Sequence, residues 1–268
     1  MQSSFNVLWL YDLPQWLFCL IVVAVFVGVA LAGQIATRKL VRRWLGDRDC
    51  NDVVGQYLSA VGLLYGITLG LISVGAWENY GEVEGKVSQE AAAVATLYRS
   101  VDTYPEGKRT ELTTLLREYT RQVIDVAWPE MRQGIVPAGG NPIVSRFQRA
   151  LAAFEPATEG QGAVHAEALR QFTHLVDCRR LRLDSVTQQL PGILWVVVFA
   201  GSLLSLMLTW LLVLENRRLH DLLTAMLASL LGLLIFLLAT LDLPFQGHHS
   251  LEPDSFELIY QQLMKPQP

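Results

Sequence analysis

Four long apolar runs constrain the fold of this chain more than any other feature. They form two pairs on either side of a polar segment, and none contains Asp, Glu, Lys, Arg or His. The runs cover residues 16–35, 53–76, 193–214 and 222–241. A bilayer core about 30 Å thick is crossed by about 20 helical residues, and lipid leaves the backbone to satisfy its own hydrogen bonds. Each run therefore predicts a transmembrane helix, whereas four buried helices of a soluble protein would be expected to carry charges.

The fold class that follows is an all-α membrane protein, with four transmembrane helices in a two-plus-two layout around a helical extramembrane domain. We expect a lead and two spans in 1–77, the helical domain in 78–190, two spans in 191–241 and a tail in 242–268. Apolar residues recur every three or four positions after Val83, which predicts that the second span continues as one helix until near Tyr104. A second helix is expected to end at Trp128-Pro129, and two more to follow. The chain shows no β-strand alternation.

Composition and motifs exclude several classes of function. The net charge of −4 does not suit nucleic-acid binding, which needs a clustered basic surface. The three cysteines are scattered, and the adjacent His248 and His249 lack the spacing and co-ligands of a metal site. We find no catalytic motif, and no acidic or basic residue inside the spans that could relay protons. We expect no enzyme activity, no cofactor and no bound metal.

Basic residues in the short links predict the orientation of the chain in the membrane. The links 37–52 and 215–221 together hold seven Lys and Arg residues, whereas the lead holds none and the tail only Lys265. Short loops rich in Lys and Arg prefer the cytoplasm. We therefore expect both links on the cytoplasmic side and the helical domain outside.

The second span carries a stripe of small residues on one helix face. These helix-packing candidates are Ser59, Gly62, Gly66, Gly70 and Ser73. Small side chains allow two helices to approach closely in lipid. The partner is either another subunit or another helix of the same chain, and the spacing does not decide between them. The flanking face, with Tyr65, Leu69 and Ile72, would then point toward a pore or toward lipid.

Charged residues gather where the spans meet the polar segment. The candidates are Glu78, Glu82, Glu90, Arg179, Arg180 and Arg182. In a ring of subunits such residues would form a charged vestibule that influences ion entry. The alternatives are a solvated helix face for the carboxylates, and interface anchors or ion pairs with Glu82 or Glu90 for the arginines.

Several separated segments together resemble a known family. They are 65–70, 77–80, 90–91, 97–99, 190–195 and 241–247, followed by Pro253 and Phe256. Within them the signature positions are Trp77, Pro191, Trp195, Asp242, Pro244, Phe245 and Gly247. This pattern is similar to the bacterial bestrophin-like membrane proteins of unknown function, which are remotely similar to bestrophin anion channels. Leu243 stands where that family often has a basic residue.

The resemblance implies a function as well as a fold. Bestrophins are pentamers in which the second span lines the pore, which would bring Tyr65, Leu69 and Ile72 near the axis. We expect a homo-oligomeric, anion-conducting channel in a bacterial inner membrane, with the lipid bilayer and small ions as partners. One alternative is a membrane-anchored sensor or interaction protein that does not transport. The other is a stator-type ring subunit, which would need a carboxylate or another proton-handling group near the pore.

Overall fold

The computed structural model describes residues 13–45, 50–137, 142–247 and 250–265, and every regular element in these residues is helical. Four helices are long and apolar enough to cross a membrane: α1 (Gln15–Leu45), α2 (Asn51–Val101), α7 (Gly192–Trp210) and α8 (Arg217–Asp242). The predicted all-α membrane fold with four candidate spans is confirmed. By packing, the described chain divides into a membrane unit (13–79, 189–242 and 247) and a helical unit (80–188, 243–246 and 250–265).

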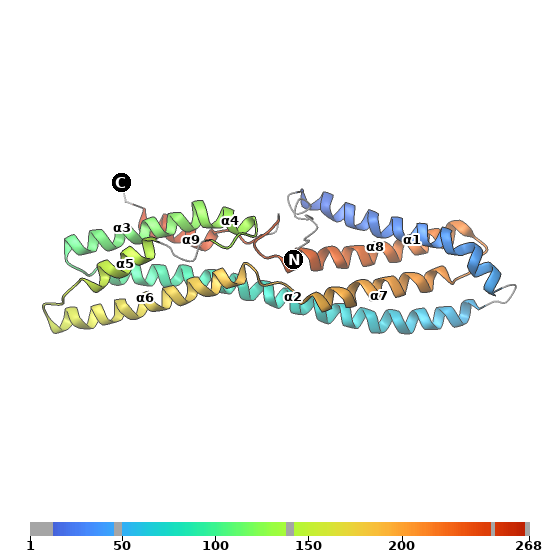
Figure 1. Ribbon diagram of the computed structural model, residues 1–268, viewed down its shortest axis with the longest axis horizontal. Helices are drawn as coiled ribbons and strands as arrows, with labels where there is room; N and C mark the ends of the chain where they lie inside the picture. The colour runs from blue at the N-terminus through green and yellow to red at the C-terminus, as the bar shows by residue number, and fades with distance from the viewer. Residues whose placement is uncertain (1–12, 46–49, 138–141, 248–249, 266–268) are drawn as a thin grey trace, which may run out of the picture. The chain divides into compact units, whose positions relative to one another are not determined.

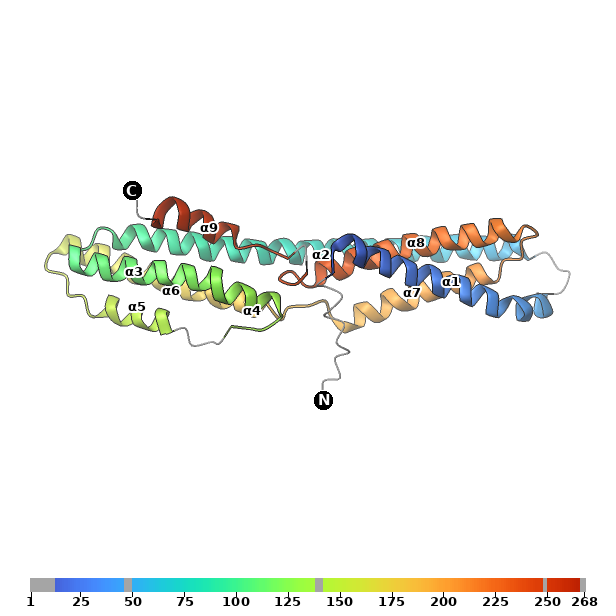
Figure 2. The ribbon, with the colours of Figure 1, turned by 90° about the horizontal axis from the view of Figure 1, so that it is seen from above.

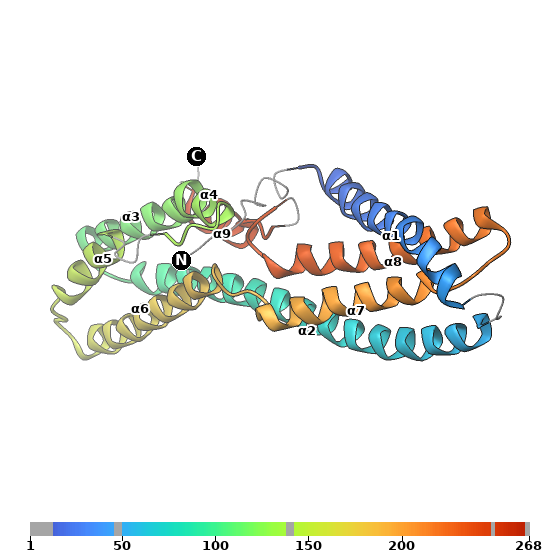
Figure 3. The same cartoon turned by 45° about the vertical axis from the view of Figure 1, so that its right-hand side comes forward.

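In the membrane unit, the four helices follow one another in space in the order α1, α8, α7, α2 (Figure 1 and Figure 3). Close approach of α1 to α8 depends on Gly232, where an added Cβ would lie 3.0 Å from the backbone of Val23. Trp210 of α7 fills the space that a side chain at Gly33 would need, and its indole nitrogen donates to the Ala30 carbonyl at 2.9 Å. The absence of a side chain at these glycines of α1 and α8 thus leaves space into which the neighbouring helix packs.

A tyrosine joins α2 to α7. The ring of Tyr65 occupies the position of the missing side chain at Gly201. Its hydroxyl donates to the Val198 carbonyl at 2.8 Å and lies 2.7 Å from the Ser202 hydroxyl. At the link end, the Asn51 side-chain amide exchanges two hydrogen bonds with the Val213 backbone, at 2.8 and 2.9 Å. In apolar surroundings these few polar contacts fix where α2 lies against its own chain.

In the helical unit, one hydrophobic core unites helices from all parts of the segment. The helices are α3 (Glu106–Gln122), η2 (Val123–Ala127), α4 (Trp128–Arg132), α5 (Pro142–Ala152), α6 (Glu159–Ser185), α9 (Asp254–Ile259) and η3 (Tyr260–Met264). The last turns of α2 contribute Val83, Val87 and Val94, as their helical spacing predicts. Figure 2 shows α5 lying beside α3. The Phe147 ring of α5 stacks on the Phe172 ring of α6, with ring centroids 5.4 Å apart.

One helix end was predicted wrongly. The helical backbone does not stop at Trp128-Pro129 but passes through η2 into α4 and ends at Arg132. Pro129 lies in the first turn of α4, where a missing N–H costs no intrahelical hydrogen bond after a π-helical turn. Trp128 is 2% exposed, and its ring packs against Phe245 and Phe256.

The tail belongs largely to the core of the helical unit. Phe245, Phe256 and Met264 are buried there, and the Phe245 ring meets Trp128 edge to face at 5.8 Å. The Trp128 indole nitrogen donates to the Leu251 carbonyl at 2.9 Å. Gly247 has φ +84°, a left-handed conformation that glycine adopts without strain. The tail is therefore a structural part of this unit, which the sequence alone did not indicate.

Candidate functional site

The face of α2 that carries the small-residue stripe is not covered by its own chain. Ser59, Gly62, Gly66 and Gly70 are exposed, and a Cβ added at any of the three glycines would meet no other atom within 4 Å. Only 6% of the most apolar stretch of α2 is buried, against 39% for α8. Among the described residues, the stripe therefore has no partner helix within the chain. Packing between copies stays a prediction.

The flanking face of α2 faces its own α7. Leu69 is 2% exposed, Tyr65 is half-buried in its contact with α7, and Ile72 is half-buried. We expected these side chains to point toward a pore or toward lipid, but the contacts of Tyr65 turn this face inward. Ser73, the last residue of the stripe, is half-buried and donates its hydroxyl hydrogen to the Leu69 carbonyl at 2.8 Å. A role of any α2 side chain in lining a pore stays a prediction.

A buried ion pair lies in the core of the helical unit. The Arg182 Nε donates to Glu90 Oε2 at 2.6 Å and Nη2 donates to Oε1 at 3.2 Å. The two side chains are 1% and 0% exposed. The Tyr119 hydroxyl donates to the same carboxylate, and the Met131 sulfur lies 3.0 Å from Arg182 Nη1. The predicted ion-pair alternative is thus confirmed for Arg182 and Glu90, whose charges are enclosed within the chain.

Burial shapes the protonation of this cluster. It raises the pKa of Tyr119 well above its ordinary value, and the nearby Glu90 carboxylate raises it further. Burial alone would lower the pKa of Arg182, but the charge and hydrogen bonds of Glu90 reverse that effect, so the pKa is raised. Arg182 therefore stays a cation and Tyr119 a neutral donor across the physiological range.

The other predicted vestibule residues lie at the surface or near it. Glu82 pairs with Lys86 at 2.9 Å and Arg180 approaches Asp184 at 3.8 Å, both one helical turn apart. Glu78 is exposed, and Arg179 is half-buried. Pairs of this kind contribute little to stability. A vestibule role for these residues stays a prediction.

The signature residues of the third and fourth spans meet at one place. The Asp242 carboxylate at the end of α8 accepts from the Leu190 backbone N–H and, at 3.1 Å, from the Trp195 indole N–H. Pro191 stands between these two donors as the N-cap of α7. Each oxygen of Asp242 thus holds one group at the start of α7. The sequence pattern identified these residues, but it did not indicate that they contact one another.

The remaining signature residues have different environments. Pro244 and Phe245 are buried, Gly247 takes the left-handed turn, and Trp77 is 65% exposed. Within the described residues, no group of three His, Cys, Asp or Glu side chains could hold a metal ion. The pair 248–249 lies outside the described residues.

The stability of the helical unit should depend on alkaline pH through Tyr104. Its hydroxyl lies 2.8 Å from Nδ1 of His165, and burial raises its pKa to about 12. The folded state keeps the phenol protonated above its ordinary pKa near 10, so this contribution is complete below pH 10 and is lost as the pH rises toward 12. Melting temperature should fall less steeply between pH 10 and 12 in Tyr104→Phe than in wild type. Equal slopes in the two proteins would contradict this assignment.

Comparisons with known proteins agree with the geometry. A family model described as a bestrophin-like domain matches residues 24–256. The fold is similar to the crystal structure of a bacterial bestrophin homologue from Klebsiella pneumoniae carrying a point mutation, with a TM-score of 0.64 and 15% identity, over 93% of this chain and 99% of that one. The fold is also similar to the crystal structure of a membrane protein variant, with a TM-score of 0.64 and 14% identity, over 93% of this chain and 99% of that one. A search of curated proteins found no match.

Proposed function

Because this chain belongs to the bestrophin-like family, we propose that it is a homo-oligomeric ion channel that conducts anions along a pore lined by α2. The family and the shared fold both favour an ion channel in general over an enzyme. Pentameric assembly is part of the proposal by resemblance to bestrophins.

The uncovered stripe on α2 carries the proposal. Tyr65 and Leu69 fix one face of α2 to α7, and at 100° per residue the stripe lies about a quarter of the circumference away from them. In a closed ring of copies, an uncovered face of small residues can pack against the neighbouring subunit or border the axis. We therefore assign Ser59, Gly62 and Gly66 to the axial side, in place of the face first predicted.

The charge distribution favours anions at one end of this pathway. The four apolar runs carry no fixed charge, and the two links together hold seven Lys and Arg residues against five Asp and Glu residues, a net charge of +2. Arg38, Arg42 and Arg217 are among them and lie at the link ends of α1 and α8. A ring of copies would multiply this positive charge and raise the local anion concentration.

A stator role is disfavoured by the environment of Asp242. It is the acidic residue at the end of α8, and it is 8% exposed. Its two oxygens each accept a hydrogen bond from the start of α7. A carboxylate held in this way joins the end of α8 to the start of α7, and it is poorly placed to exchange protons with a partner.

Anion flux into liposomes tests the proposal. Purified wild-type protein should conduct chloride, and Gly66→Leu should reduce the flux at least tenfold by filling the axial face or separating the copies. Gly75→Leu is the matched control, because Gly75 is also without neighbours but lies well away from the stripe. Native mass spectrometry, performed in parallel, should show an oligomer for the wild type and for the control.

Each other outcome has a defined meaning. Absence of flux from an intact wild-type oligomer would overturn the channel and leave a membrane-anchored interaction protein. Flux of cations alone would overturn anion selectivity. Equal loss in Gly66→Leu and Gly75→Leu would overturn the assignment of the stripe to the axis.

We assign the protein to a bacterial inner membrane, with both links in the cytoplasm and the helical unit outside. A membrane-impermeant maleimide applied to spheroplasts should leave Cys50 unlabelled until the membrane is permeabilised. Cys178 is 3% exposed, so its labelling cannot report on which side of the membrane the helical unit lies. We therefore introduce a cysteine at an exposed position of α6 with the substitution Thr173→Cys. That site should be labelled without permeabilisation. The reverse pattern would invert the orientation.

A further inference from the structure

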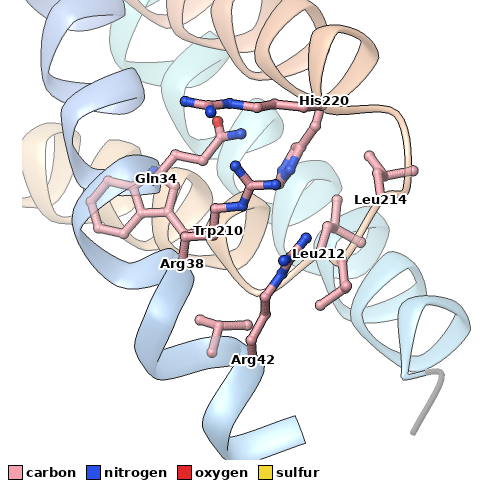
Figure 4. Close-up of a pocket in the computed structure, with 10 residues that line it drawn as sticks. Gln34, Arg38, Arg42, Trp210, Leu212, Leu214 and His220 are labelled. Atoms are coloured by element: carbon pink, nitrogen blue, oxygen red, sulfur yellow. The ribbon is translucent and has the colours of Figure 1, made fainter. Parts of the chain in front are cut away.

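A small basic pocket lies at the link end of the membrane unit, apart from the α2 stripe. It is lined by side chains of α1, α7 and α8 and by the connection between the last two helices. Its volume is about 30 Å³, which is room for about two water-sized groups. Figure 4 shows the side chains of Arg38, Arg42, Trp210 and His220 converging with the amide of Gln34. A space of this size admits the oxygens of a small ionic group but excludes a nucleotide or an aromatic ring.

The donors available to an occupant come from arginines. Arg38, Arg42 and Arg217 line the pocket, and the third approaches the Asp221 carboxylate at 3.8 Å. Among the described residues, neither of the first two has a carboxylate within ion-pair distance, so the pocket keeps an excess of positive charge. Guanidinium groups bind phosphate and carboxylate through paired N–H donors.

The ring N–H groups of the wall are already engaged. The Trp210 indole N–H donates to the Ala30 carbonyl at 2.9 Å. The His220 Nε2 lies 3.0 Å from the Thr209 carbonyl, which can only accept, so this nitrogen carries the hydrogen. Both rings therefore serve as fixed walls, and their N–H groups are not free for an occupant.

One buried acceptor in the pocket lacks a partner. The Gln34 side chain is 6% exposed, and its amide nitrogen donates to Asp221 Oδ1 at 3.0 Å. That carboxylate can only accept, so the assignment of the amide nitrogen is fixed and Oε1 is the atom left over. Within the described residues Oε1 is buried without any hydrogen-bond partner. An unsatisfied buried acceptor is costly, and a hydroxyl of an occupant would satisfy it.

We propose that this pocket binds a phosphate group that carries a neighbouring hydroxyl, as in a glycerophosphate headgroup. The arginines hold the phosphate oxygens, and Gln34 Oε1 accepts from the hydroxyl. The pocket lies at the link end of the apolar run 16–35, at the depth where lipid headgroups meet water. The same chemistry is offered by the headgroup of phosphatidylglycerol and by free glycerol phosphate, so the test separates the two sources.

Native mass spectrometry of the detergent-purified protein provides the test. Phosphatidylglycerol should be retained by wild type, and phosphatidylmethanol, which has the same charge but no headgroup hydroxyl, at least threefold less. The double variant Arg38→Gln, Arg42→Gln should reduce retention of phosphatidylglycerol at least tenfold. The double variant Lys39→Gln, Arg43→Gln is the matched control, because it removes the same charge from exposed positions on α1 that do not line the pocket. Unchanged melting temperatures would show that both variants fold.

Each alternative result is decisive. Equal loss of phosphatidylglycerol in the two double variants, or no retention by wild type, would overturn the pocket. Equal binding of the two lipids would overturn the role of Gln34. Competition by millimolar glycerol phosphate would support the phosphate chemistry and identify a soluble occupant, whereas its failure would identify the lipid. None of these results depends on whether the protein conducts ions.

Discussion

Arg182→Met should lower the free energy of unfolding of the helical unit by about 3–5 kcal/mol, because it leaves a carboxylate buried without its cation. Glu90 is 0% exposed, and the remaining neutral donor, Tyr119, cannot replace a guanidinium that makes two hydrogen bonds. Hydrogen exchange of the buried amides in α3 and α6, measured by mass spectrometry in detergent, reports this loss for the unit itself.

Two further variants make the expectation specific. The double variant Glu90→Leu, Arg182→Met should recover most of the loss, because no buried charge then lacks a partner. Arg170→Met breaks an exposed ion pair between Arg170 and Glu167, whose side chains are 69% and 44% exposed respectively. It should lower the free energy of unfolding by less than about 1 kcal/mol. An Arg182→Met protein as stable as wild type would show that the ion pair is not buried in the folded protein.

Trp128→Ala should destabilise the same unit by about 3–5 kcal/mol, the usual cost of removing a large aromatic side chain from a core. The indole packs against Phe245 and Phe256, with ring centroids 5.8 and 6.3 Å away, and donates a hydrogen bond to Leu251. The substitution therefore leaves a cavity and an unsatisfied carbonyl, and should release the tail. Faster exchange of the α9 amides would measure that release.

A graded series separates packing from hydrogen bonding at this position. Trp128→Phe keeps most of the aromatic contact and should cost less than the alanine variant. Leu258→Ala on α9 truncates a side chain that is 55% exposed, and should change stability by less than about 1 kcal/mol. If α9 exchanged at the same rate in Trp128→Ala and in wild type, the tail would not be held by this contact.

Local sequence patterns were sufficient to predict an element of the fold where one physical effect dominates. An apolar run of about 20 residues has few alternatives to a membrane helix, so all four spans could be predicted from composition and length. The continuation of α2 and its end near Tyr104 followed from helical spacing and from Pro105. The helix through Pro129 was missed because proline stops a helix only when the preceding turn needs its N–H.

The candidate site could be predicted only in part. The glycine stripe and the charged residues were identified from spacing, and the Glu90–Arg182 pair was among the alternatives considered. The inward turn of Tyr65 was missed because it depends on Gly201 and Ser202, which belong to another span. The Gln34 pocket was likewise invisible, since its walls come from three separate helices.

The amino-acid sequence by itself determined that this chain is a four-span helical membrane protein with a helical domain. The free energies that enforce this, apolar transfer and backbone hydrogen bonding, depend on each segment alone. The tertiary structure decided which face of α2 its own chain covers, which charges are enclosed and which buried acceptor lacks a donor. Those outcomes depend on contacts between residues far apart in the sequence, whose energies no single segment contains.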